Sequence, residues 1–375
     1  MKIGMLFPLS NAYPGIGQDF IDGLTALTSH DNTNITILKE SVGFGAVEKD
    51  VCLKAEKLLI SDDVDILIAF VDEKVLPILH PLVQATGKLM LVVNTGANYP
   101  VDWIPQPTIV HLTLQHGFLC WLTGKPAAQS GNGAGLMATT YYDCGYLHAA
   151  AMVKHFLQEG GSIRYNYVNN QAYDNNFEID ALTNFLSANP DCENLLCVFD
   201  QLPASLFYDR LSRPTINRQL KLFSSPMMLQ QKALENNRDG FPFSIEGFIP
   251  WHPLLENKQN EAFLNSCKRP ASIFSLLGWE TGLVLTEIIK NNIAYSDGEK
   301  IISHLANFPL ESPRGKLWLD KETQHYVGPA LSFRLDAGEV LPTINIEPIT
   351  ENEWRAFAIP TEGAVTGWTN TYLCY

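Results

Sequence analysis

The stretch that decides the fold is residues 3–24, IGMLFPLSNAYPGIGQDFIDGL. It opens with an apolar run typical of a buried strand, which ends at Pro8, and it continues into the apolar periodicity of a helix. Between the two lie a hydroxyl, an amide, an aromatic ring and two glycines. Because open α/β sheets hold ligands in the loops between a strand and a helix N-terminus, this segment predicts a small-molecule binding loop.

The rest of the chain repeats this alternation of short strands and helices, which predicts parallel sheets with crossover helices. In the first third we expect strands at 3–7, 35–38, 65–70, 88–94 and 108–112, with helices near 16–30, 46–60 and 74–86. After a glycine-rich break at 122–135, interpreted as a loop, we expect strands at 135–140, 163–168, 194–200 and 220–224, with helices at 144–158, 175–188, 202–213 and 226–236. Two successive layouts in 375 residues predict an α/β protein with two Rossmann-like lobes.

These motifs resemble those of type I periplasmic binding proteins of the leucine/isoleucine/valine-binding family. The opening strand, loop and helix are similar to the first binding loop of that family, with Asn11 where glycine is usual. Three later stretches match in order and spacing: FSIEGFI at 243–249, SLLGWETG at 275–282 and SPRGKLWLD at 312–320.

The resemblance implies two lobes joined by a three-strand hinge. The chain is expected to cross between the lobes near 113–116, 246–250 and 328–333. The N-terminal lobe then comprises residues 1–114 and 249–329, and the C-terminal lobe comprises residues 115–248 and 330–375. Three strands that share one hinge allow bending without disruption of either core.

Composition and charge narrow the function classes. Hydrophobic residues make up 46% and charged residues 18% of the chain, as in soluble globular proteins. The net charge is −14 with only 26 Lys and Arg residues, so we expect no nucleic-acid partner. No run of 18 apolar residues occurs, so we expect no membrane span.

The sequence gives no signal of catalysis. It contains no G-x-S-x-G, H-E-x-x-H or G-x-x-x-x-G-K-[ST] motif. The seven cysteines are an odd number without C-x-x-C spacing, which favours buried reduced thiols over a zinc site. We therefore expect no enzyme activity, no metal and no cofactor.

Candidate ligand-binding residues are those that directly follow the predicted strands, because ligands of open α/β sheets bind at the carboxyl ends of strands. They are Ser10, Tyr13, Asp72, Glu73, Asn94, Thr95, Gly96, Ala97, Tyr141, Tyr142, Gln201 and Met227. The stretch at 94–97 is similar to the family loop whose amides and hydroxyl hold an amino-acid carboxylate. The same composition also suits a simple turn.

Two departures from the family bear on the ligand. Asp72 and Glu73 stand where hydroxyl residues usually hold the carboxylate, and an acidic pair there would repel it. Alternatively, the pair forms the first turn of the next helix, where acidic residues complement the dipole. Met227 stands where amino-acid binders place a glutamate, whose bond to the ligand ammonium is worth about 1.5–3 kcal/mol. We expect an amino acid derivative, an amide or an amine.

The resemblance implies a solute-binding protein that closes around a small molecule and delivers it to an ABC transporter permease. The alternative is a cytosolic ligand-sensing regulator, similar to the amide-sensing proteins of this fold. The first strand follows directly after Lys2, without the pattern of a signal peptide. The expected location is periplasmic if a signal peptide has been removed and cytoplasmic if Met1 is the native start.

Overall fold

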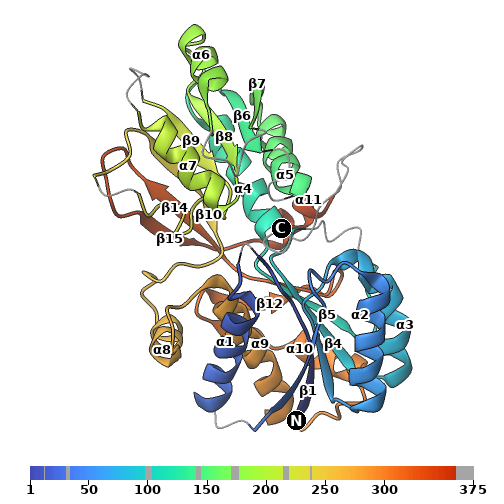
Figure 1. Ribbon diagram of the computed structural model, residues 1–375. Helices are drawn as coiled ribbons and strands as arrows, with labels where there is room; N and C mark the ends of the chain where they lie inside the picture. The colour runs from blue at the N-terminus through green and yellow to red at the C-terminus, as the bar shows by residue number, and fades with distance from the viewer. Residues whose placement is uncertain are drawn as a thin grey trace.

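Two α/β units, connected near the middle of the molecule, make up the protein (Figure 1). The structure is a computed structural model, and it describes residues 1–11, 13–30, 34–97, 104–140, 145–169, 177–213, 219–236 and 239–359. Each unit is a sheet dominated by parallel strands, with helices packed against it. The predicted fold class, α/β with two lobes, is confirmed.

The first sheet has eight strands in the order β11-β12-β13-β5-β4-β3-β1-β2. Its strands are β1 (Lys2–Phe7), β2 (Thr36–Ser41), β3 (Ile66–Ala69), β4 (Leu89–Asn94), β5 (Ile109–Thr113), β11 (Leu310–Ser312), β12 (Gly315–Leu319) and β13 (His325–Val327). The helices of this lobe are α1 (Ile16–His30), α2 (Glu48–Glu56), α3 (Leu76–Thr86), α9 (Ile273–Lys290) and α10 (Gly298–Leu305). Strands β1 to β5 and β13 pair in parallel, and β11, β12 and β13 pair antiparallel.

The second sheet has seven strands in the order β15-β14-β10-β9-β8-β6-β7. Its strands are β6 (Ala134–Thr140), β7 (Ser162–Asn169), β8 (Asn194–Val198), β9 (Lys221–Ser224), β10 (Ser244–Ile249), β14 (Ala330–Leu335) and β15 (Thr343–Glu347). Its helices are α4 (His116–Gln129), α5 (Gly145–Gln158), α6 (Asp180–Ala188), α7 (Gln201–Leu211) and α11 (Glu351–Ala358), while α8 (Lys258–Ser266) follows β10.

Burial explains why the central strands are so apolar. Every residue of β3 and β4 is buried, because helices cover both faces of the first sheet (Figure 1).

On one face, α1 and α9 cross at very short range. A Cβ at Gly278 would lie 1.9 Å from the carbonyl oxygen of Phe20, and one at Gly23 would lie 1.8 Å from that of Ser275. Only glycine fits at this crossing.

Two sequence interpretations are wrong. The stretch at 122–135 is not a loop at its start, since α4 runs to Gln129. Gly124 belongs to this helix because a Cβ there would lie 2.4 Å from the carbonyl oxygen of Met152 in α5, so the glycine permits close helix packing and does not mark a break. The stretch at 226–236 forms successive turns, not a helix, and its three consecutive apolar residues at 227–229 are all buried.

A buried ion pair fixes two of the connections between the sheets. Arg314 and Glu280 are fully buried, with Nε of Arg314 2.7 Å from Oε1 of Glu280 and Nη2 3.0 Å from Oε2. The same guanidinium donates to the carbonyl oxygen of Thr113 (3.0 Å) and to Oε1 of Gln115 (3.3 Å), at the first connection. Oε1 of Gln115 also accepts from the backbone amide of Gly328 (3.0 Å), at the third connection.

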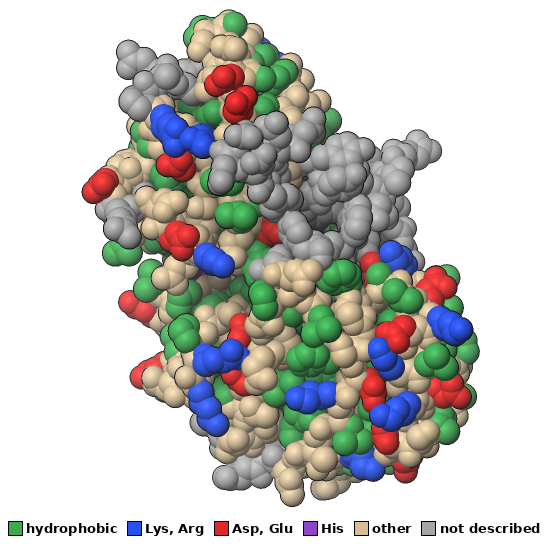
Figure 2. Space-filling view, in the orientation of Figure 1, with side chains coloured by type: hydrophobic (Ala, Val, Ile, Leu, Met, Phe, Trp, Pro, Cys, Tyr) green, Lys and Arg blue, Asp and Glu red, His purple; other side chains and the backbone are tan. Residues whose placement is uncertain are grey.

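The surface mixes charges of both signs. On the face in Figure 2, the described basic side chains are interspersed with acidic ones over both lobes. Pairs such as Arg213 with Asp209 (2.9 Å) and Arg334 with Asp336 (2.8 Å) lie largely in solvent. Such exposed pairs contribute little to stability, typically about 0–1 kcal/mol.

Candidate functional site

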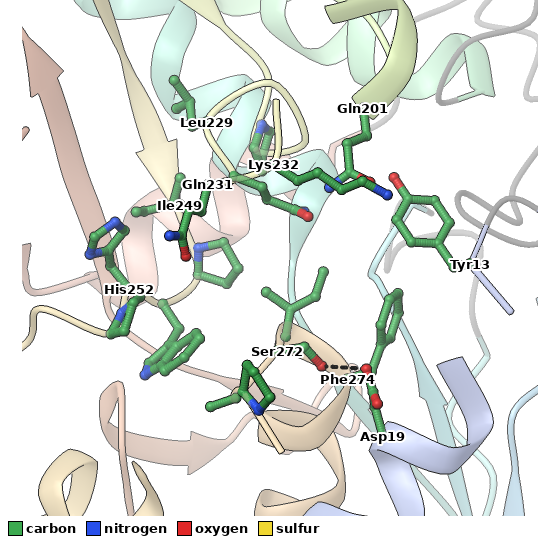
Figure 3. A pocket seen from close by; sticks show the side chains of 18 of the residues that line it. Tyr13, Asp19, Gln201, Leu229, Gln231, Lys232, Ile249, His252, Ser272 and Phe274 are labelled. Atoms are coloured by element: carbon green, nitrogen blue, oxygen red, sulfur yellow. Dashed lines mark hydrogen bonds between the residues drawn. The ribbon is translucent and has the colours of Figure 1, made fainter. Parts of the chain in front are cut away.

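A cleft of about 560 Å³ lies where the two lobes face each other (Figure 3). The first lobe contributes residues 13–16, 19 and 270–274, the second lobe contributes 201, 226, 229–232 and 235, and residues 249–253 add the end of β10 and the segment after it. Because both lobes line the cleft, any change in their relative position changes its shape.

The walls of the cleft are mainly apolar, with a few polar groups. Ile16, Leu229, Ile249, Trp251 and Phe274 supply aliphatic and aromatic surface, together with several prolines. Figure 3 shows the polar side chains on the same walls, among them Gln201, Gln231, Lys232 and His252. An apolar cavity of this size with a few polar groups suits a small organic molecule.

Asp19 is a carboxylate of the cleft that already has its partners. Its Oδ1 lies 2.9 Å from Nη2 of Arg269, and its Oδ2 accepts a hydrogen bond from Oγ of Ser272 at 3.0 Å (Figure 3). Ser272 in turn caps α9, because its side chain accepts from the backbone amide of Ser275. The negative charge of Asp19 is therefore compensated within the first lobe.

Tyr13 connects the two lobes. Its backbone amide donates to Oγ of Ser10 (3.0 Å), and its ring packs edge-on against Phe274 at 6.0 Å between centroids. Its hydroxyl donates to Oδ1 of Asp200 at 2.8 Å. Asp200 follows β8 and caps α7, where its side chain accepts from the backbone amide of Gln201 (2.6 Å). Burial raises the pKa of Asp200 above its ordinary value.

His252 is a neutral polar group of the cleft wall. Burial lowers its pKa to about 4. Its Nδ1 lies 3.2 Å from the backbone amide of Leu254, so Nδ1 accepts and carries no proton. The proton of the neutral ring is then on Nε2, which makes this nitrogen a hydrogen-bond donor.

The candidate loop at 94–97 packs against the first connection. Oδ1 of Asn94 accepts from the backbone amide of Gly96 (2.8 Å), which closes a turn. Gly96 has φ +77°, and a Cβ there would lie 2.5 Å from the backbone nitrogen of Gln115. The carbonyl oxygens of Thr95 and Gly96 accept from the amides at 116 and 117, and Thr95 and Ala97 are buried.

Asp72 starts a helix. It is buried, its Oδ1 accepts from the backbone amide of Lys74 (3.1 Å), and its Oδ2 lies 3.6 Å from Nζ of the same lysine. It immediately precedes the short 3₁₀ helix η2 (Glu73–Val75), which leads into α3. This arrangement is the one expected if Asp72 begins the next helix, as in the second interpretation of the sequence. The side chain of Glu73 lies outside the described residues.

The structure thus brings two of the sequence candidates, Tyr13 and Gln201, to the wall of the cleft. Ser10 lies behind them as a support for Tyr13. Met227 is fully buried in the core, and its neighbour Pro226 faces the cleft instead. Tyr141 and Tyr142 lie outside the described residues.

Sequence reasoning missed Asp200, His252 and the segment before α9. For that segment a signal existed, since Ser272 stands directly before an apolar helical pattern, as N-cap residues do. The partnership of Tyr13 with Asp200 had no local signal, because 187 residues separate them.

Comparisons with known proteins identify the fold. The sequence matches no protein-family model and no curated protein. A solute-binding protein of an ABC transporter from R. palustris, solved with benzoate, has 18% identity and a TM-score of 0.71 over 94% of this chain and 98% of its own. An ABC transporter substrate-binding protein from Sphaerobacter thermophilus has 16% identity and a TM-score of 0.73 over 93% and 97%. The branched-chain amino acid binding protein LivJ from Streptococcus pneumoniae, solved with isoleucine, has 12% identity and a TM-score of 0.68 over 92% and 99%.

The chain has the type I periplasmic binding protein fold. The sequence resemblance to this group, drawn from the strand–loop–helix at residues 3–24 and the three later motifs, is confirmed by these neighbours. In this periplasmic binding protein fold, the cleft lies between the lobes and beside the segments that connect them. None of the helices in the described part of the chain is long and apolar enough to cross a membrane.

Proposed function

We propose that the chain is the solute-binding component of an ABC transporter. In this proposal, a small organic molecule enters the cleft, contacts both lobes and stabilises the closed arrangement by its higher affinity for it. The observation that carries the proposal is the 560 Å³ cleft lined from both sheets, in a fold whose neighbours are transport proteins solved with small ligands. In this proposal the binding protein is periplasmic, and the membrane permease recognises its closed form.

The proposed lobes are 1–114 with 249–329 and 115–248 with 330–375. Membership of the two sheets supports these boundaries, because β1 to β5 and β11 to β13 form one sheet and the remaining strands form the other. The ligand of this proposal binds between them. Among the candidates at the strand ends, we propose Tyr13 and Gln201 as ligand contacts, because both lie in the cleft wall, and Ser10 as the support of Tyr13.

For the ligand we propose a neutral amide, an amine or an amino acid derivative with an apolar body. The apolar walls favour such a body, and the amides of Gln201 and Gln231 can both donate and accept hydrogen bonds. Asp19 is paired with Arg269, and Asp200 accepts the hydroxyl of Tyr13, so neither carboxylate requires a cationic group on the ligand. The ligands of the neighbours, benzoate and isoleucine, share the apolar body and add a carboxylate. Carboxylic acids must therefore be tested beside the amides and amines.

A thermal-shift panel tests this proposal. It compares amides, amines, branched-chain amino acids and benzoates on the wild type, on Gln201→Leu in the cleft wall and on Gln158→Leu, an exposed control at the end of α5. We expect a rise in Tm with at least one amide or amine, lost in Gln201→Leu and kept in the control. A shift with acids alone would overturn the ligand class, and no shift in the whole panel would count against a binding protein.

The regulator alternative gains no support from the comparisons. The neighbours named above are transport proteins, and none of the contacts in the described residues favours a regulatory partner. We therefore put forward transport alone.

A further inference from the structure

A direct hydrogen bond joins the two lobes across the cleft. The bond runs from the hydroxyl of Tyr13, in the loop after β1, to Oδ1 of Asp200, directly after β8 (2.8 Å). These are loops at the carboxyl ends of strands in two different sheets, and neither belongs to the segments that connect the lobes. Figure 3 shows Tyr13 and Gln201, the neighbour of Asp200, on the same side of the cleft.

Each half of this bond is held in place by its own lobe. On the first lobe, the Ser10 hydroxyl accepts from the backbone amide of Tyr13, and Phe274 of α9 supports its ring. On the second lobe, Asp200 is fixed as the cap of α7 by the backbone amide of Gln201. Because both partners are oriented before they meet, the bond forms at little cost in side-chain entropy.

The contacts at the hinge are of a different kind. Trp354 of α11 packs against Phe118 of α4 (5.4 Å) and against His325 of β13 (6.0 Å), and Arg355 pairs with Asp320 (2.6 Å). These contacts lie where the chain passes between the lobes. The Tyr13–Asp200 bond instead joins two loops that face each other over the cleft, so separation of the lobes must break it.

We propose that Tyr13 and Asp200 form a latch that holds the lobes together in the ligand-free protein. A charge-assisted hydrogen bond of this kind shifts a two-state equilibrium by about tenfold or more. The latch therefore shifts the equilibrium of the ligand-free protein towards the closed arrangement, which lowers the free-energy cost of closure when a ligand binds. The latch acts in the ligand-free chain, whichever solute binds.

Small-angle X-ray scattering of the ligand-free protein tests the latch, with native mass spectrometry used first to establish that no small molecule is bound. Tyr13→Phe keeps the ring on Phe274 but removes the donor. We expect its radius of gyration to exceed that of the wild type, as the closed-to-open ratio falls about tenfold. Asp200→Ser, which keeps a helix-capping hydroxyl but is too short to reach Tyr13, should expand the protein in the same way.

The control is Tyr167→Phe, which removes a hydroxyl bonded to the carbonyl oxygen of Glu178 within the second lobe. It should leave the scattering curve unchanged, and circular dichroism should show all three variants folded. Tyr13→Phe and Asp200→Ser curves that superimpose on that of the wild type would overturn the proposal. So would a wild-type curve that already fits separated lobes.

Discussion

Removal of the Arg314 guanidinium should destabilise the first lobe strongly. In Arg314→Met, the carboxylate of Glu280 stays in a site with no exposed side-chain surface and loses both of its bonds to the guanidinium. The carbonyl oxygen of Thr113 and Oε1 of Gln115 each lose a donor as well. Breaking a buried pair from one side typically costs about 3–5 kcal/mol, because it leaves an uncompensated charge.

Urea unfolding followed by circular dichroism measures this cost as a loss in the free energy of unfolding. The matched control is Arg334→Met, whose pair with Asp336 is exposed and should change stability by about 1 kcal/mol or less. The double variant Glu280→Met/Arg314→Met removes both charges and should recover a large part of the loss. A loss below about 1 kcal/mol in Arg314→Met, or a double variant no more stable than the single one, would show that Glu280 does not need the guanidinium as its partner.

Two further predictions concern pH and helix packing. Burial lowers the pKa of His325 to about 4, below the 6.5 of the unfolded chain, so its contribution is complete above about pH 6.5 and is lost as the pH falls towards 4. The shift in pKa corresponds to roughly 3 kcal/mol of stability. Urea unfolding should show a lower free energy of unfolding at pH 5 than at pH 7, and His325→Gln should reduce this difference. An equal pH dependence in both proteins would contradict the role of His325. In Gly278→Ala the new Cβ meets the carbonyl oxygen of Phe20 at 1.9 Å, so α1 and α9 must separate and the Tm should fall by several degrees, whereas an unchanged Tm would show that the crossing adapts freely.

Much of the fold follows from local sequence signals. Residues 3–24 combine a buried strand, a polar loop and a helix, and the structure has β1 and α1 at those positions. Continuous apolar runs such as β4 are typical of strands covered on both faces, which is why the parallel sheets could be predicted. The second half of α4 could not, because the role of Gly124 depends on Met152, in a helix that follows later in the chain.

The candidate site was less accessible to prediction, because its residues meet only in the folded chain. Tyr13 was found from its place after a strand, but its partner Asp200 lies 187 residues away. Asp72 left two interpretations open, and its bond to the amide of Lys74 depends on the backbone conformation of the next turn. Met227 was named from its place after a strand, but its side chain is fully buried and its neighbour Pro226 lines the cleft.

Native mass spectrometry of gently purified protein, with identification of any molecule released on denaturation, tests most directly whether the cleft holds a small organic solute. We predict an added mass of one small molecule per chain, released as an amide, an amine or an amino acid derivative with an apolar body. A bare mass in every preparation and at millimolar concentrations of these added solutes would contradict it.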